Sequence, residues 1–283
     1  MESEFALSEL ALAQPRKFSP NSYYPNFFIL PTGFPNSVGV YIGAGSRNDH
    51  YDTTGASYLL RKMLTRGSPN FSKADIAEQI EGMGATLGGD SGREHQTLKV
   101  HCFKGDVSRV VNMLGEAVSS ATLDPAEVEL AKQELIADHE QDTSEFERTL
   151  LENVHYNSFR EHQLGQPIRG DLSSVENLNA DVLNDYRAAN YFGDNIVIVG
   201  TGGVSHEQFV DQVNSAFNTI AQKTSQPTVG TDKPIYGPAL MMIRDDEMYN
   251  SNVGVFYDAP SIKHPDYYSF LLLKSMLGSY RID

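Results

Sequence analysis

Apolar positions along the chain follow two periods, one typical of strands and the other of helices. Residues 37–45 and 96–103 alternate in polarity, and 195–199 is apolar after its first residue, so each predicts a strand. Helical spacing predicts helices over 55–64, 72–84, 106–118, 124–141, 145–159, 180–190 and 205–221. The pattern therefore predicts a folded unit in which strands and helices are interspersed.

The predicted helix over 124–141 carries both a start signal and an unusual acid. Asp124 and Pro125 supply an N-cap and a proline at the first helical position. Asp138 continues the apolar row of this helix, which is formed by Val128, Ala131 and Leu135. An acid on that row is expected to face the interior, where an unpaired charge is costly. Asp138 should therefore have a cationic partner.

A change of pattern divides the chain after residue 221. Residues 222–237 are polar and without period, which predicts a linker, whereas 239–244 and 252–257 predict paired strands and 264–277 a helix. This second unit of about 46 residues is too small to bury a core of its own. We expect further sequence or another chain to complete it. The predicted organisation is 1–36 as an N-terminal arm and first strand, 37–221 as the first domain, 222–237 as the linker and 238–283 as the start of a second domain.

Charge and composition exclude several classes of function. Lys and Arg number 22 against 37 Asp and Glu, a net charge of −15 that opposes binding to nucleic acid. Cys102 is the only cysteine, so an internal disulfide and a cysteine-built zinc site are excluded. Residues 18–46 carry no charge, but the four prolines among them exclude a transmembrane helix.

Two short motifs match the letters of enzyme signatures without their context. Residues 89–92, Gly-Asp-Ser-Gly, resemble the surroundings of a serine nucleophile, but the next residue is Arg93 and a turn of this composition is common. Residues 200–205 lack the third glycine of a dinucleotide fingerprint. Neither the His-Glu-x-x-His nor the His-x-x-Glu-His arrangement of zinc peptidases occurs.

Several segments together resemble a known family over nearly the whole chain. They are Val-Gly-Val-Tyr-Ile-Gly-Ala-Gly-Ser-Arg47, Gly-Ala-Ser-Tyr-Leu-Leu-Arg-Lys-Met63, Ile-Glu-Gly-Met-Gly-Ala85, Cys-Phe-Lys-Gly-Asp-Val107, Leu-Gly-Gln-Pro-Ile-Arg-Gly170, Gly-Gly-Val-Ser-His206 and Arg-Asp-Asp246. The chain is similar in these to the pitrilysin-type, inverted-zincin metallopeptidases, in particular their mitochondrial branch. The resemblance implies an α+β fold in which a mainly antiparallel sheet is covered by helices, with two homologous halves of which the second is incomplete.

The resemblance also implies which residues occupy the family's zinc site. Tyr58 stands at the first zinc histidine, Arg61 at the catalytic glutamate, Lys62 at the second histidine and Asp138 at the third ligand, a glutamate in the family. A cationic Arg61 cannot act as a general base, and a protonated Lys62 repels a metal. No metal or other cofactor is therefore expected. Our hypothesis is that Lys62 or Arg61 pairs with Asp138; the alternative is that both basic side chains point to solvent.

The resemblance to the mitochondrial branch implies a role without catalysis. One expectation is a scaffold (core) subunit of ubiquinol-cytochrome c reductase, peripheral to the inner membrane on its matrix side. Its partners would be the other core subunit, cytochrome b, cytochrome c1 and the Rieske subunit. The alternative is a presequence-binding subunit of a heterodimeric processing peptidase, which the acidic balance of the chain suits.

Overall fold

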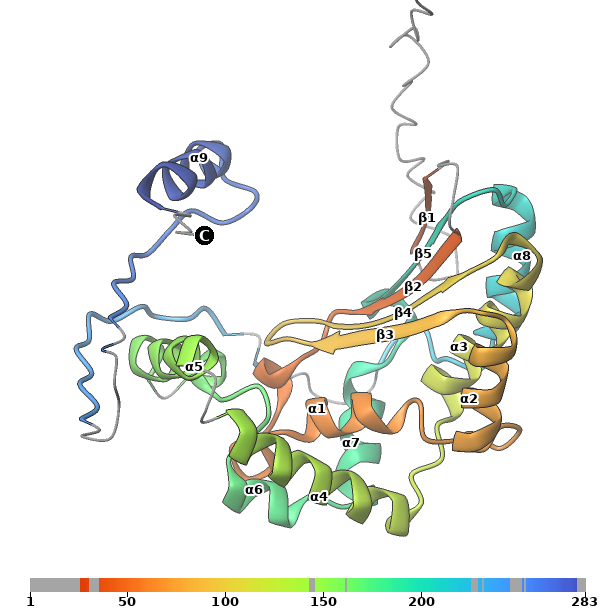
Figure 1. Ribbon diagram of the computed structural model, residues 1–283, viewed down its shortest axis with the longest axis horizontal. Helices are drawn as coiled ribbons and strands as arrows, with labels where there is room; N and C mark the ends of the chain where they lie inside the picture. Colours follow the sequence, from red (N-terminus) through yellow and green to blue (C-terminus); the bar gives the residue numbers. More distant parts are fainter. Residues whose placement is uncertain are drawn as a thin grey trace, which may run out of the picture.

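The computed structural model describes residues 26–278, except 31–35, 143–145, 161, 225–228, 231, 245–250 and 252. Of the segment 1–36, predicted as an N-terminal arm and first strand, residues 1–25 and 31–35 lie outside the described part. The strands are β1 (Asn26–Leu30), β2 (Asn36–Ile42), β3 (Thr86–Ser91), β4 (Gln96–Cys102) and β5 (Ile196–Thr201). The helices are α1 (Ala56–Met63), α2 (Lys73–Gly82), α3 (Val107–Ser120), α4 (Pro125–Asp142), α5 (Phe146–Ser158), α6 (Leu172–Asn177), α7 (Ala180–Asn190), α8 (His206–Ala216) and α9 (Tyr267–Leu277) (Figure 1).

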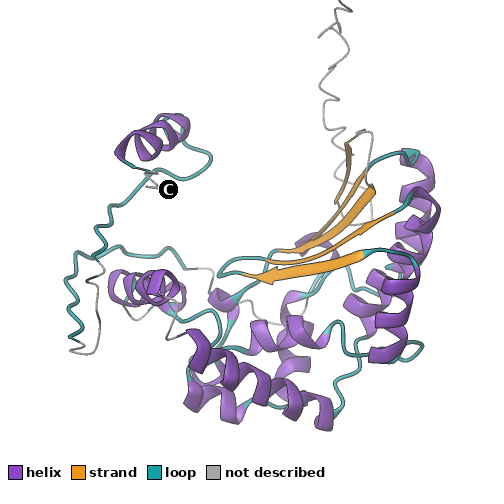
Figure 2. Ribbon diagram, in the orientation of Figure 1, coloured by secondary structure: helices purple, strands orange, loops and turns teal. Residues whose placement is uncertain are grey.

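The five strands form one sheet in the order β1-β5-β2-β4-β3. β2 runs antiparallel to both β4 and β5, and β3 runs antiparallel to β4. Only the pair of β1 with β5 is parallel. Figure 2 shows α1, α2, α3, α7 and α8 on one side of this sheet. The expected α+β fold, with a mainly antiparallel sheet covered by helices, is confirmed.

The core lies between the sheet and these helices. Val38, Val40 and Ile42 alternate along β2 and are at most 2% exposed, so one face of the strand is buried. Helix α3 packs on β2 and β4 and also on α8, where Gly115 allows close approach. A methyl group at Gly115 would lie 2.6 Å from the Ala216 carbonyl oxygen.

Most predicted helices and strands are present, with differences near the chain's second unit. Helix α9 confirms the helix expected at 264–277, and α8 ends earlier than expected, at Ala216. The paired strands expected at 239–244 and 252–257 were wrong for the described residues there, which carry no strand. Alternating polarity stabilises a two-stranded ribbon only when one of its faces packs on something. Leu240, Met242 and Val253 are instead more than four-fifths exposed.

The predicted linker makes specific contacts with the sheet domain in its described residues. Asn48 donates to the Val229 carbonyl at 2.9 Å, and the Gly237 amide donates to the Ser158 carbonyl at 3.0 Å. The Tyr236 ring meets that of Phe159 edge to face. This stretch therefore lies against the C-terminal end of α5 and the loop after β2. None of the helices in the described segments is long and apolar enough to cross a membrane.

Two glycine-to-alanine substitutions should change stability in opposite directions. Gly115→Ala places a methyl group against the Ala216 backbone and should lower the free energy of unfolding by about 1–3 kcal/mol. Gly82→Ala, in α2, meets no atom within 4 Å and should raise it by about 0.5–1 kcal/mol through helix propensity. Urea unfolding of both variants checks this. An equal change in the free energy of unfolding in both variants would show that α3 and α8 do not pack this closely at Gly115.

Candidate functional site

Helix α1 is held under the sheet by its apolar face and by a buried acid at its N-terminus. Leu59, Leu60 and Met63 are fully buried. The oxygens of the Asp49 carboxyl group, in a residue that is 1% exposed, accept hydrogen bonds from the amides of Gly55 and Ser57, each at 2.9 Å. These two amides are among those that a helix leaves without an intrahelical partner. The anchored helix presents Tyr58, Arg61 and Lys62 on its other side.

Gly55 also fixes the loop that lies beside α1. Its φ of +91° is in the left-handed region, and a Cβ at this position would lie 2.6 Å from the Arg169 carbonyl oxygen. Only glycine satisfies both the backbone angle and the close contact. As a result the loop that carries Arg169 reaches the same site as α1.

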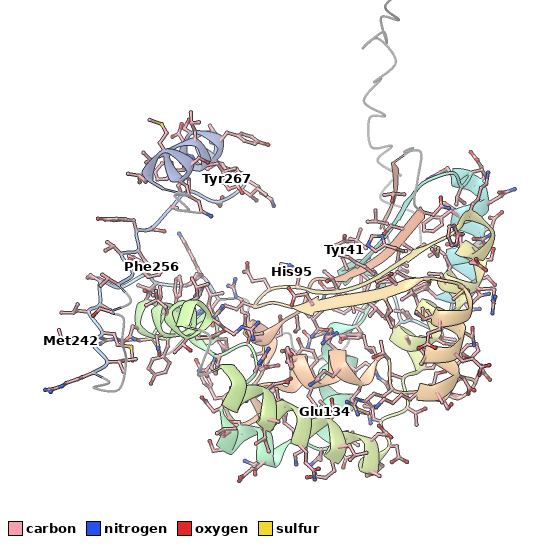
Figure 3. All side chains as sticks on the ribbon, viewed as in Figure 1. Tyr41, His95, Glu134, Met242, Phe256 and Tyr267 are labelled. Atoms are coloured by element: carbon pink, nitrogen blue, oxygen red, sulfur yellow. The ribbon has the colours of Figure 1, made fainter. Side chains whose placement is uncertain are left out.

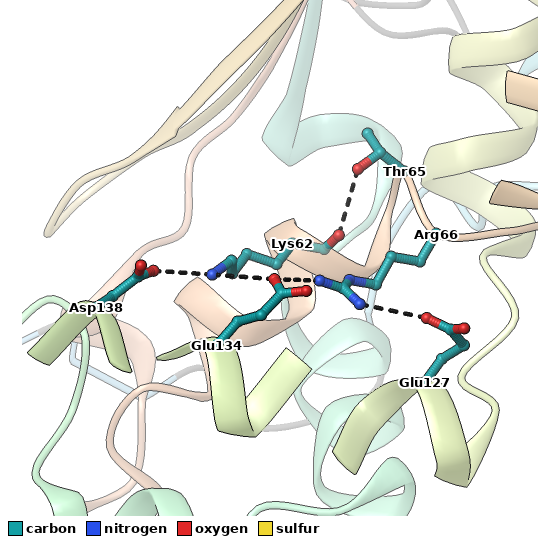
Figure 4. A network of polar contacts seen from close by, with 6 residues as sticks. All are labelled: Lys62, Thr65, Arg66, Glu127, Glu134 and Asp138. Atoms are coloured by element: carbon teal, nitrogen blue, oxygen red, sulfur yellow. Dashed lines mark hydrogen bonds and ion pairs between the residues drawn. The ribbon is translucent and has the colours of Figure 1, made fainter. Parts of the chain in front are cut away.

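An ion-pair network joins α1 to α4 (Figure 4). Lys62 Nζ lies 2.9 Å from Asp138 Oδ2 and 3.6 Å from Glu134 Oε2. The Arg66 side chain, 7% exposed, pairs with Glu134 and with Glu127, the latter at 3.2 Å. Arg66 donates to Glu134 and so holds the pKa of that carboxyl below its usual range. The hypothesis that Lys62 or Arg61 pairs with Asp138 is confirmed for Lys62.

Tyr58 lies among three cationic groups. The guanidinium carbons of Arg61 and Arg169 lie 5.7 Å and 5.3 Å from the Tyr58 ring centroid, and Lys62 Nζ lies 5.9 Å from it. These distances are typical of cation–π contacts. Arg169 also donates to the Asp138 carbonyl at 3.2 Å. The structure therefore brings all four predicted site residues together and adds Arg169.

Sequence analysis assigned no role to Arg169, although the loop that contains this residue was among the segments that resemble the peptidase family. A residue in a loop has no periodic position from which its neighbours can be inferred. The sequence offers one signal, the neighbouring Gly170, because glycine is common in constrained turns; in the structure its φ is +77°.

A cleft of about 740 Å³ opens beside Tyr58. Polar side chains from β3, α5 and the loop before α6 line it, among them Asp90, Arg148, Glu152 and Arg169. Arg93 pairs with Glu152 at 2.6 Å. The cleft is therefore wide enough for a small molecule or a short peptide, and charged groups of both signs surround it.

The residues at this site do not fit a zinc ion. The Lys62 ammonium lies against the Asp138 carboxylate, where a metal would have to bind. At contact distance each cation would oppose a metal by about 4 kcal/mol per unit charge at moderate dielectric. In the described part of the chain, no three His, Cys, Asp or Glu side chains are grouped so that they could hold a metal.

The same α+β fold is found in solved structures. The structure matches a protease from Helicobacter pylori with a TM-score of 0.65, at 12% identity over 71% of this chain and 49% of that one. It matches a peptidase M16 inactive domain from Pseudomonas fluorescens with the same TM-score, at 17% identity over 74% of this chain and 50% of that one.

The chain belongs to peptidase family M16, the pitrilysin-type family expected from its sequence. The family description Insulinase (Peptidase family M16) matches residues 32–172, and Peptidase M16 inactive domain matches residues 177–282. The second match begins before β5, which is hydrogen-bonded between β1 and β2. The boundary between the two matches therefore lies inside one folded sheet domain.

Curated relatives of this chain are mitochondrial proteins by name. A probable mitochondrial-processing peptidase subunit beta of Schizosaccharomyces pombe is 26% identical over 86% of this chain and 54% of its own length. The ubiquinol-cytochrome-c reductase complex core protein I of Euglena gracilis is 28% identical over 87% and 50%. The cytochrome b-c1 complex subunit 1 of Rattus norvegicus is 24% identical over 86% and 51%. The chain spans about half the length of these relatives.

The stability conferred by Asp49 should depend on pH. Burial raises the pKa of Asp49 from 3.8 to about 8. Above about pH 4 the unfolded chain releases this proton, whereas the folded state retains it. The contribution of Asp49 to the free energy of unfolding is therefore complete at low pH and is lost as the pH rises toward 8. The free energy of unfolding of the wild type, minus that of Asp49→Asn, should fall by up to about 1.4 kcal/mol per pH unit between pH 5 and 7. Urea unfolding across this range measures it; a flat or rising difference would show that the buried carboxylate is ionised.

Four substitutions should convert the site into a zinc site if its positions are those of the family's ligands. Tyr58→His, Lys62→His and Asp138→Glu supply the ligands, and Arg61→Gln removes the neighbouring charge. We expect about one zinc per chain after dialysis, measured by mass spectrometry, and none in the wild type. The matched control carries Asp138→Ala in place of Asp138→Glu and should lose most of this zinc. Equal zinc content in the two variants, both checked for folding by circular dichroism, would contradict the assignment.

Proposed function

We propose that this chain is a non-catalytic core subunit of mitochondrial ubiquinol-cytochrome c reductase, peripheral to the inner membrane on its matrix side. The observation that carries the proposal is the Lys62–Asp138 pair at 2.9 Å, at a site where Arg61 and Tyr58 supply neither a zinc ligand nor a general base. A domain that keeps the peptidase fold but lacks the zinc ligands and the general base is suited to the role of a scaffold. Relatives named as complex III core subunits support the assignment.

The proposed scaffold role also accounts for the exposed apolar residues of the second unit. Figure 3 shows Met242, Phe256 and Tyr267 on a segment that runs past α5 toward α9. Helix α9 has no buried residue although most of its side chains are apolar. Apolar surface of this extent is typically covered by another part of an assembly.

We propose the same domain organisation as the sequence predicted. Residues 1–36 form the arm and first strand, 37–221 the peptidase-like domain, 222–237 the linker and 238–283 the start of a second domain. Further sequence or another chain would complete that second domain. The other core subunit, cytochrome b, cytochrome c1 and the Rieske subunit are the proposed partners.

A second candidate function is a non-catalytic, presequence-binding subunit of a heterodimeric processing peptidase. Two observations favour it: relatives of this chain are named as processing peptidase beta subunits, and the net charge of −15 complements basic peptides. In that case the zinc would belong to the other subunit.

Native electrophoresis of the endogenous protein in mild detergent distinguishes the two functions. We expect the chain to migrate in a haem-containing band, and mass spectrometry of that band should identify cytochrome b, cytochrome c1 and the Rieske subunit. A small heterodimer without haem, together with zinc-dependent cleavage of presequences, would replace the first function with the second.

Substitutions on α9 test whether its apolar surface joins the assembly. Leu272 and Leu277 are 65% and 80% exposed, so Leu272→Glu with Leu277→Glu should leave the sheet domain folded. We expect the doubly substituted chain to be absent from the haem-containing band of the native gel, because assembly would bury two charges at an interface. The matched control, Leu130→Glu on α4, changes a leucine that is 50% exposed and should assemble normally.

A further inference from the structure

The carboxyl group of Asp49 is buried where the loop after β2 meets the first turn of α1. The residue is 1% exposed, and its two oxygens accept the hydrogen bonds of the Gly55 and Ser57 amides. The Ser57 hydroxyl also lies 3.2 Å from Asp49 Oδ2. The first turn of α1 is thus held by a side chain that can gain or lose a charge.

Buried hydroxyl groups connect Asp49 to α7, which packs beside α1 under the sheet (Figure 1). The Ser57 side chain forms a hydrogen bond with that of Tyr186, and the Tyr186 hydroxyl donates to the Gly45 carbonyl at 2.9 Å. Gly45 lies in the same loop as Asp49. One connected set of hydrogen bonds therefore joins α1, α7 and the loop after β2.

The loop before α6 rests on the residues that immediately precede α1. The Asp171 amide donates to the Thr54 hydroxyl at 3.1 Å, and a Cβ at Gly170 would lie 2.7 Å from the Gly55 amide nitrogen. Residues 167–173 of this loop and the start of α6 line one side of the 740 Å³ cleft. A movement of Thr54 and Gly55 would therefore move that wall of the cleft as well.

The charge of an ionised Asp49 is poorly compensated in this closed arrangement. Burial outweighs the two amide donors and raises the pKa of Asp49 from 3.8 to about 8. Tyr186 faces it from α7, and burial, together with the charge that Asp49 would carry, raises the pKa of this tyrosine well above its ordinary value. Tyr186 thus stays neutral and supplies no charge of its own.

Other charged groups on the elements around Asp49 are either engaged elsewhere or exposed. Among the described residues, the engaged cations are Arg47 with Glu94, Lys62 with Asp138, Arg61 and Arg169 over the Tyr58 ring, and Arg187 with the Ala121 carbonyl. The exposed groups are His50, Asp52, Asp171, Asp181 and Asp185.

We propose that Asp49 is a pH-sensitive latch, which holds the first turn of α1 and the loop over 169–171 in place when it is protonated and loosens both when it ionises. Ionisation in the closed structure leaves a charge in a buried site, whereas local opening lets water reach it. The open form releases its proton above about pH 4. The equilibrium constant for opening should therefore rise about tenfold per pH unit between pH 5 and 7, and level off above about pH 8. This inference does not depend on the proposed function.

Hydrogen exchange of the full chain, followed at single amides by NMR, tests the latch. We expect the amides of Gly55, Ser57 and Asp171 to share one protection factor, which falls about tenfold per pH unit between pH 5 and 7. The Val100 amide of the central strand β4 reports global unfolding and should stay more strongly protected at every pH. Equal protection of all four amides would show that these contacts break only on global unfolding, and it would overturn the proposal.

The same substitution at two helix N-termini separates the effect of Asp49 from other effects of pH. Asp49→Asn keeps an acceptor oxygen but cannot ionise, so the protection of Gly55 and Ser57 should no longer change with pH. The matched control, Asp75→Asn, changes the exposed acid in the capping box of α2 and should keep the pH dependence of the wild type. A pH dependence in Asp49→Asn equal to that of the wild type would overturn the assignment.

Titration of the Asp49 carboxyl carbon by NMR needs no substitution and tests the wild type even if Asp49→Asn fails to fold. We expect a midpoint near pH 8. A midpoint at or below pH 4 would show that the amides of α1 stabilise the ionised form in the closed structure, and it would overturn the proposal.

Discussion

The ion pairs between α1 and α4 are the constraint on which the arrangement of the site depends. Lys62 and Arg66 project from one end of α1 and its following turn, and Asp138, Glu134 and Glu127 repeat along the facing side of α4. Because Leu59 and Leu60 fix α1 under the sheet, these pairs also fix α4 relative to the sheet. Removing one partner would leave a partly buried charge, so the contact specifies orientation as well as stability.

The Lys62–Asp138 pair joins α1 and α4 at 2.9 Å, at positions that the family resemblance of the sequence assigns to metal ligands. A zinc ion bridges ligands from two helices and so holds them together. An ammonium group on one helix and a carboxylate on the other can do the same without a cofactor, provided that the remaining lone pairs are satisfied. Arg169, which donates to the Asp138 backbone, contributes to this. The Lys62–Asp138 pair and the Arg169 contact thus hold α1, α4 and the loop before α6 together.

Local signals in the sequence predicted local structure well, and long-range partners much less. The N-terminus of α4 was predictable because Asp124 accepts from the Ala126 amide at 2.8 Å within three residues of chain. The Asp138 partner was predictable because the apolar row of α4 placed an acid on its inner side. The contribution of Arg169 depends on Gly55 and a loop far along the chain. The strands expected after residue 238 are absent from the described residues there. Alternating polarity allows a segment to pair as a strand, but the pair is stable only if it packs on another surface.

The position of β5 in the sheet has a consequence for the order in which the domain can form. β5 lies between β1 and β2 in the sheet. In the sequence, however, residues 196–201 come after nearly all the other residues of the domain. During synthesis from the N-terminus, β2 can pair with β4 early but keeps one open edge until β5 emerges. Such an edge is a template for wrong pairing, and contacts of high sequence separation form slowly. The half-formed sheet is therefore the stage at which this chain would most benefit from a chaperone.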